Sequence, residues 1–154
     1  MAVWAQEDDL RTHATRPGAG IAPLHGILLA FPVALFAAAL VTDITYLNTA
    51  EVQWTNFSQW LIAGADLFSG LVLAWALLAV FFGRSGQGRG RRVFYLIVVA
   101  VMFVLGVVNA FQHARDGWHS VGTVGLVLSI LCSVLALVAG WLAYGSGRAV
   151  EYGR

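Results

Sequence analysis

The feature that most restricts the fold of this chain is a long uncharged segment, LHGILLAFPVALFAAALVT, which lies between Pro23 and Asp43. A helix rises about 1.5 Å per residue, so the segment would span roughly 30 Å, the thickness of the hydrocarbon core of a bilayer. His25 and Asp43 would then lie near opposite faces of a membrane. The segment therefore predicts a transmembrane helix, with Pro32 as a kink near its middle.

Three further apolar segments follow, and we expect helices over residues 21–46, 53–82, 92–112 and 118–144. Only 11% of the 154 residues are charged, whereas a soluble domain carries about 25%. Inside a bilayer the backbone must satisfy its own hydrogen bonds, and the alternating pattern of a membrane β-barrel is missing. The sequence thus predicts an all-α fold, an integral membrane four-helix bundle.

The arginines predict the orientation of this bundle. Eight of them fall in the two tails and the second connection, and only Arg115 falls on the opposite side. Because cytoplasmic loops are rich in Lys and Arg, both termini are expected in the cytoplasm. The domain organisation would be a cytoplasmic tail over 1–20, a membrane domain over 21–147 and a second cytoplasmic tail over 148–154.

The fourth expected helix carries small residues at steps of three and four, which would form one face. They are Gly122, Gly125, Ser129, Cys132, Ser133, Ala136, Gly140 and Ala143. Small residues let membrane helices approach closely. This face is expected to pack either inside the bundle or against another membrane subunit or a second copy, and the sequence leaves both open.

Polar side chains are costly within a membrane and are often functional. In the predicted topology six of them lie in the outer half of the bundle: Asp43, Asp66, Asn109, Gln112, His113 and His119. Only His25 lies in the inner half. We read Asp66 either as a proton relay or counter-ion to His113, or as a neutral acid that bonds Asn109 or a backbone carbonyl and ties helices together.

The histidines allow several kinds of site. His113 and His119 flank a short loop and could bind a metal ion together with Asp43 or Asp116. The same two histidines, or His25 beside the free carbonyl opposite Pro32, could ligate a b-type haem. The alternative to metal or haem ligation is a structural role, in which each histidine is hydrogen-bonded at the membrane interface. We find no nucleophile-and-base arrangement, so the chain alone is not expected to be an enzyme.

Two segments resemble a known family. In PLHGILLAFPVAL, the residues His25, Phe31, Pro32 and the later Asp43 resemble the first helix of the bacterial membrane family DUF2231, which reads near H-P-x(4)-F-P-I-A-L. Gly26 departs from that pattern, where the family usually has proline. The closing GWLAYGSGRAV is similar to the family's last segment. The resemblance implies a four-helix domain of the bacterial inner membrane without an assigned activity, some of whose members are associated with redox modules.

Three functions remain open from the sequence. The chain could be a structural or accessory subunit of a membrane complex, such as a respiratory or other redox complex. It could be an electron-transfer protein that binds haem b or quinone through His25, His113 or His119. It could also be a small ion transporter or sensor that uses a periplasmic-side cluster of Asp43, Asp66, His113 and His119. No feature suggests a nucleic-acid partner.

Overall fold

The computed structural model describes residues 23–83, 88–115 and 121–145. This part of the chain forms four helices: α2 (Pro23–Thr49), α3 (Val52–Phe81), α4 (Arg89–His113) and α5 (Thr123–Tyr144). All four are long and apolar enough to span a membrane. The predicted all-α four-helix membrane bundle is therefore confirmed, whereas the prediction that both termini are cytoplasmic stays a prediction.

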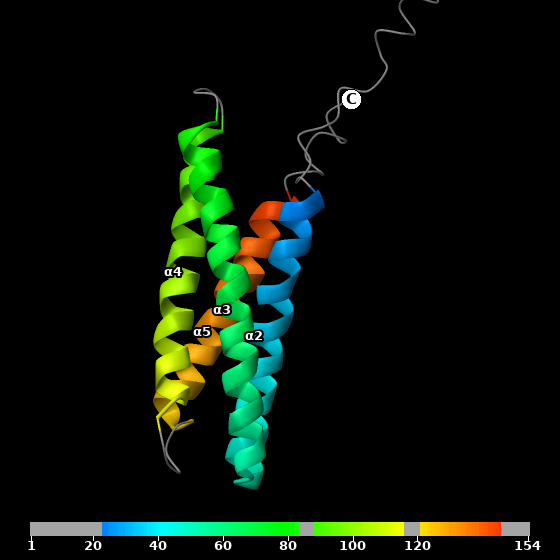
Figure 1. Ribbon diagram of the computed structural model, residues 1–154, viewed down its shortest axis with the longest axis vertical. Coiled ribbons are helices and arrows are strands. Elements are labelled where there is room, and N and C mark those ends of the chain that lie inside the picture. Colours follow the sequence, from blue (N-terminus) through cyan, green and yellow to red (C-terminus); the bar gives the residue numbers. More distant parts are fainter. Residues whose placement is uncertain (1–22, 84–87, 116–120, 146–154) are drawn as a thin grey trace, which may run out of the picture.

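The helices run antiparallel to their neighbours in the chain (Figure 1). Each packs on the one before it, and α5 closes the ring by packing on α2 as well as on α4. In Figure 1, α5 crosses the bundle obliquely, so its C-terminus lies beside the N-terminus of α2. We call the end where α2 and α4 finish the Asp43 end, and the opposite one the His25 end.

The ends of the helices are closed by specific local contacts. Ala50 follows α2 with a positive φ of 55°, and its N–H donates to the Tyr46 carbonyl at 2.7 Å. This left-handed residue stops α2 and turns the chain directly into α3. At the His25 end, Arg91 donates to the Leu142 carbonyl at 2.9 Å and Arg92 donates to the Ala79 carbonyl at 3.3 Å. Two arginines in the first turn of α4 thus bind carbonyls in the last turns of α5 and α3.

The outer surface of the bundle is apolar, as expected of a protein surrounded by lipid. Phe111 is 73% exposed, Phe81 78% and Trp141 78%. By contrast, the interior contains polar side chains toward the Asp43 end and apolar ones toward the middle of the bundle. Leu29, Val72, Val99 and Met102, each 0% exposed, form an apolar layer that separates the polar residues of the Asp43 half from His25.

The small-residue face of α5 lies inside the bundle. Gly125, Ser129, Ser133, Ala136 and Gly140 are all buried within this single chain, while Gly122 is half-buried and precedes the helix. Of the two alternatives, the structure shows the one in which this face packs inside the bundle, because the chain's own helices cover it. Other membrane subunits or a second copy as partners of the chain stay a prediction. Close approach of helices through small residues is used here to close the ring.

Candidate functional site

A buried polar cluster at the Asp43 end receives side chains from all four helices. We call it the Asp43 cluster, and its members are Asp43 of α2, Ser58 of α3, Asn109 and His113 of α4, and Ser129 of α5. Each is at most 3% exposed. Since burying a polar group without a partner costs free energy, the hydrogen bonds among these side chains decide what the cluster can do.

The carboxylate of Asp43 accepts hydrogen bonds from two serines on two different helices. The Ser58 hydroxyl donates to Oδ1 and the Ser129 hydroxyl donates to Oδ2 at 2.5 Å. Oδ1 also lies 3.0 Å from Nε2 of His113, which makes an ion pair if the imidazole is protonated. The carboxylate is thus joined directly to each of the other three helices.

The contact of the second ring nitrogen of His113 shows which nitrogen carries hydrogen. Nδ1 lies 3.0 Å from the backbone carbonyl of Asn109, one turn earlier in α4. A carbonyl oxygen only accepts, so Nδ1 carries hydrogen and Nε2 faces the carboxylate. A hydrogen bond between Nε2 and Asp43 then requires one further proton, held either by the imidazolium or by a protonated Asp43. The geometry therefore describes a pair that shares one proton.

Asn109 joins this pair to the centre of the bundle. Its Nδ2 donates a hydrogen bond to the Ser129 hydroxyl at 3.0 Å, and this hydroxyl in turn donates a hydrogen bond to Asp43. This arrangement fixes the amide with its Oδ1 directed away from Ser129, and that oxygen has no hydrogen-bond partner in the described part of the chain. Asn109 therefore presents a buried acceptor on the far side of the cluster.

Asp66 lies deeper, near the middle of α3, and is 9% exposed. It is not the counter-ion of His113, since Asp43 takes that place, and its Oδ1 has no partner among the described residues. Asp66 packs on Gly106 of α4, where a Cβ atom would lie only 2.0 Å from Oδ1. A residue without a side chain is therefore what lets this carboxylate fit between α3 and α4.

The other predicted polar residues do not join the cluster. Gln112 is half-buried on α4, although its spacing from Asn109 suggested the same face. His119 lies outside the described residues, so the metal site of Asp43, His113 and His119 stays a prediction. Within the described ranges, no three His, Cys, Asp or Glu side chains are grouped so that they could hold a metal ion.

His25 forms a separate site near the opposite end of the bundle. Its Nε2 lies 3.0 Å from the Tyr95 hydroxyl, and its ring lies 5.7 Å from that of Trp75. Nδ1 is buried and has no partner among the residues described. His25 therefore keeps one nitrogen available to a ligand, whereas both nitrogens of His113 are already hydrogen-bonded and an axial bond from it to haem iron would break one of these contacts.

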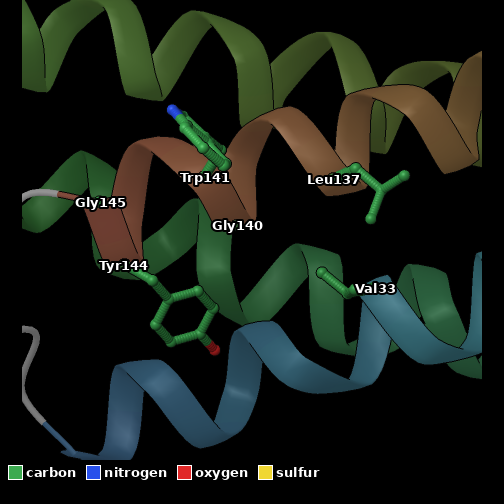
Figure 2. Close-up of a pocket in the computed structure, with 6 residues that line it drawn as sticks. All are labelled: Val33, Leu137, Gly140, Trp141, Tyr144 and Gly145. Carbon is green, nitrogen blue, oxygen red and sulfur yellow. The ribbon is translucent and has the colours of Figure 1, made fainter.

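A groove of about 400 Å³ lies between α2 and α5. Figure 2 shows Val33 of α2 facing Leu137 and Gly140 of α5, with the ring of Tyr144 turned toward α2. The Tyr144 hydroxyl donates to the Gly26 carbonyl at 2.6 Å. The walls are apolar and aromatic, and this one hydroxyl is already bonded, so the groove suits an acyl chain of the surrounding lipid more than a polar ligand.

The sequence indicated only part of these sites. It placed Asp43, Asn109 and His113 together, but the partners Ser58, Ser129, Tyr95 and Trp75 were missed as site residues. Ser129 was noticed only for its small size. A usable signal was present, because a serine in an apolar helix at the depth of an acid on a neighbouring helix is a natural hydrogen-bond donor.

Comparison with protein families matches residues 21–153 to a family described as "Predicted membrane protein (DUF2231)". Comparison with curated proteins finds no match, and neither does comparison with solved structures. The matched residues include all four helices, the Asp43 cluster and the His25 site. Since they make up nearly the whole chain, the protein belongs to the DUF2231 family of predicted membrane proteins.

Proposed function

We propose that this protein is a proton-responsive membrane protein, a small ion transporter or sensor, whose response begins at the pair of Asp43 and His113. One observation carries the proposal: Nδ1 of His113 faces a backbone carbonyl, so Nε2 and the Asp43 carboxylate share a single removable proton. Histidine is the side chain suited to gain and lose a proton near neutral pH.

Loss of that proton would disturb more than one side chain. In the deprotonated pair, the lone pair of Nε2 and the Asp43 carboxylate would face and repel each other, and both side chains are fully buried. Breaking a buried charge pair costs about 3 kcal/mol or more. Because Ser58 and Ser129 bind the same carboxylate, a shift of Asp43 would loosen the packing of all four helices at the Asp43 end.

Two other titratable groups of the described residues lie nearest to the pair. Tyr46 is buried one turn beyond Asp43 on α2, and Asp66 lies about two turns deeper on α3. From α5, the uncharged Ser129 bonds the pair. Arginines would place the Asp43 end on the periplasmic side of a bacterial inner membrane, where the pair would sense the outer pH.

The experiment that tests this proposal is a pH series of thermal unfolding on the full chain in an uncharged detergent. The hydrogen bond between Nε2 of His113 and the Asp43 carboxylate exists only while the pair holds its proton, so the sign of the expected change follows from this contact. Wild-type protein is expected to lose melting temperature toward alkaline pH. Asp43→Asn should flatten this dependence, while the exposed matched control Glu51→Gln should keep it.

Hydrogen exchange separates a responsive site from a purely structural one. Exchange at the Asp43 end, corrected for the intrinsic effect of pH, should increase in wild-type protein at alkaline pH and not in Asp43→Asn. His113→Ala leaves the carboxylate without its partner and should lower the unfolding free energy by about 3 kcal/mol. If wild type and Asp43→Asn show the same pH dependence in both measurements, the proposal is wrong.

The other two functions have less support from the geometry. An accessory subunit would need a docking face, and the small-residue face of α5 is used inside the chain. A haem or quinone protein would depend on Nδ1 of His25, the one free histidine nitrogen among the described residues. A visible spectrum of the purified protein tests haem directly, and a band that vanishes in His25→Ala would favour that function.

A further inference from the structure

The groove between α2 and α5 has the length of one membrane leaflet. Its walls include Leu137 and Gly145, eight residues apart, so it runs about 12 Å along α5. One leaflet supplies roughly half of a 30 Å hydrocarbon core, or about 15 Å. The groove ends where α5 ends, at the His25 end of the bundle (Figure 1). It therefore follows the direction and most of the depth of a lipid chain in that leaflet.

The middle of the groove is apolar and is kept empty by a glycine. A Cβ atom on Gly140 would lie 3.6 Å from Cγ2 of Val33 on α2, so a larger side chain would fill the space between the two helices. Leu137 and Trp141, which line the groove from α5, are both exposed on the outer surface of the bundle. An acyl chain of the surrounding lipid can thus enter the groove from the side.

The aromatic end of the groove lies where a lipid changes from hydrocarbon to head group. Trp141, Tyr144 and Gly145 line this end (Figure 2). A Cβ atom on Gly145 would lie 3.9 Å from Nε1 of Trp141, so the indole N–H is at the level where α5 ends. Tryptophan and tyrosine are typical of this membrane depth. A chain seated in the groove would therefore place its head group beside the C-terminus of α5.

Arg91 makes this end of the groove attractive to an anion. Its guanidinium donates to the carbonyl of Leu142, a neighbour of Trp141 in the chain, at 2.9 Å. This bond uses one of the five N–H donors of a guanidinium. The C-terminus of a helix carries roughly half a negative charge, and the full positive charge of Arg91 exceeds it. Donors are left to bind a phosphate, and the local charge favours one.

We propose that the groove binds one acyl chain of an anionic phospholipid, whose phosphate is bound by Arg91. The apolar walls hold the chain of any phospholipid, and the guanidinium gives the preference for a negatively charged head group. Basic sites between transmembrane helices bind anionic head groups in the same way. The site is independent of the Asp43 cluster, which lies toward the opposite end of the bundle.

The test is a competition between two lipids for the full chain in an uncharged detergent. Phosphatidylglycerol and phosphatidylcholine with identical acyl chains are added in equal amounts, and native mass spectrometry counts the lipids that stay bound. Wild-type protein is expected to retain one phosphatidylglycerol in preference to phosphatidylcholine. A phosphatidylglycerol with a diazirine on its acyl chain should label residues of the groove, as located by peptide mass spectrometry.

Two variants separate the head group from the chain. Arg91→Gln should reduce the preference for phosphatidylglycerol about tenfold, the effect of losing a hydrogen bond between charged groups. The matched control Arg89→Gln removes an exposed arginine two positions away, which does not share the face of Arg91, and should keep the preference. Leu137→Trp should fill the groove and reduce the binding of both lipids. Leu131→Trp, an exposed leucine of α5 outside the groove, should bind both as wild type does.

Three results would overturn the proposal. They are equal retention of the two lipids by wild-type protein, an unchanged preference in Arg91→Gln, and diazirine labelling that avoids the groove because a tail of the chain or a second copy covers it. A melting temperature near that of wild type shows that each variant is folded. Asp43→Asn should keep the lipid preference, so this proposal and the proton proposal can fail separately.

Discussion

At the scale of single residues, the role of each buried polar group depends on which atoms it faces. Asp43 was predictable as an outer-half acid, but its three donors were not, since the sequence does not show which neighbouring helices turn a serine toward it. Asp66 was predicted either as a proton relay or counter-ion to His113, or as a neutral acid bonded to Asn109 or a backbone carbonyl. Among the described residues its Oδ1 has no partner, and His113 bonds Asp43 instead.

The fit of Asp66 against Gly106 leads to a prediction of its own. Gly106→Ala would place a Cβ atom 2.0 Å from Asp66 Oδ1 and 2.9 Å from Cζ of Phe36, so the carboxylate and the ring must both shift. We expect the unfolding free energy to fall by roughly 1–3 kcal/mol, the usual cost of overpacking a core. Denaturant unfolding in detergent measures it.

The matched control for this prediction is Gly90→Ala in the first turn of the same helix. A Cβ atom at Gly90 meets nothing within 4 Å, and alanine favours a helix more than glycine does. This variant should be as stable as wild type or slightly more so. Equal stability of the Gly106 and Gly90 variants would contradict the close packing of Asp66 on α4.

At the scale of elements, the four helices were predictable because each apolar run is long enough to cross a bilayer. Their ends were less predictable. α2 continues to Thr49, past the expected end at 46, and the described α5 begins at Thr123 rather than at 118. Apolar runs mark membrane depth, whereas a helix end depends on backbone contacts, such as the left-handed turn at Ala50.

Ala50 gives the prediction at this scale. A left-handed conformation costs a residue with a side chain roughly 1–2 kcal/mol, and glycine adopts it freely. Ala50→Gly should therefore raise the unfolding free energy by roughly 0.5–1 kcal/mol, as measured by unfolding in detergent. The control Ala30→Gly, exposed inside the first half of α2, should instead lower it by roughly 1 kcal/mol. A loss of stability in Ala50→Gly would show that the turn is not left-handed.

At the scale of the whole molecule, antiparallel neighbours follow from four crossings joined in sequence, so this much was predictable. The closing of the ring by α5 on α2 was not, because the stripe of small residues fits an internal face and a partner interface equally well. Only the packing of the complete bundle distinguishes the two. The orientation in the membrane depends on arginines in the tails and connections rather than on this packing.

The orientation can be tested by cysteine labelling. Cys132 is the only cysteine of the chain and is buried, so Cys132→Ala gives a background without thiols. In that background, Glu51→Cys at the Asp43 end should react with a membrane-impermeant maleimide added outside intact cells. Gly90→Cys at the His25 end should react only after the cells are opened. The reverse pattern would place the Asp43 cluster on the cytoplasmic side.

The apolar layer has an electrical consequence. A charge that crosses the full membrane potential gains or loses about 2.3 kcal/mol per 100 mV. Most of that voltage drops where the dielectric constant is lowest, and Leu29, Val72, Val99 and Met102 make such a region between the two halves of the bundle. A proton that reaches the pair of Asp43 and His113 from the Asp43 end would cross only a small fraction of the field, so the response of the pair should follow the pH on that side far more than the voltage.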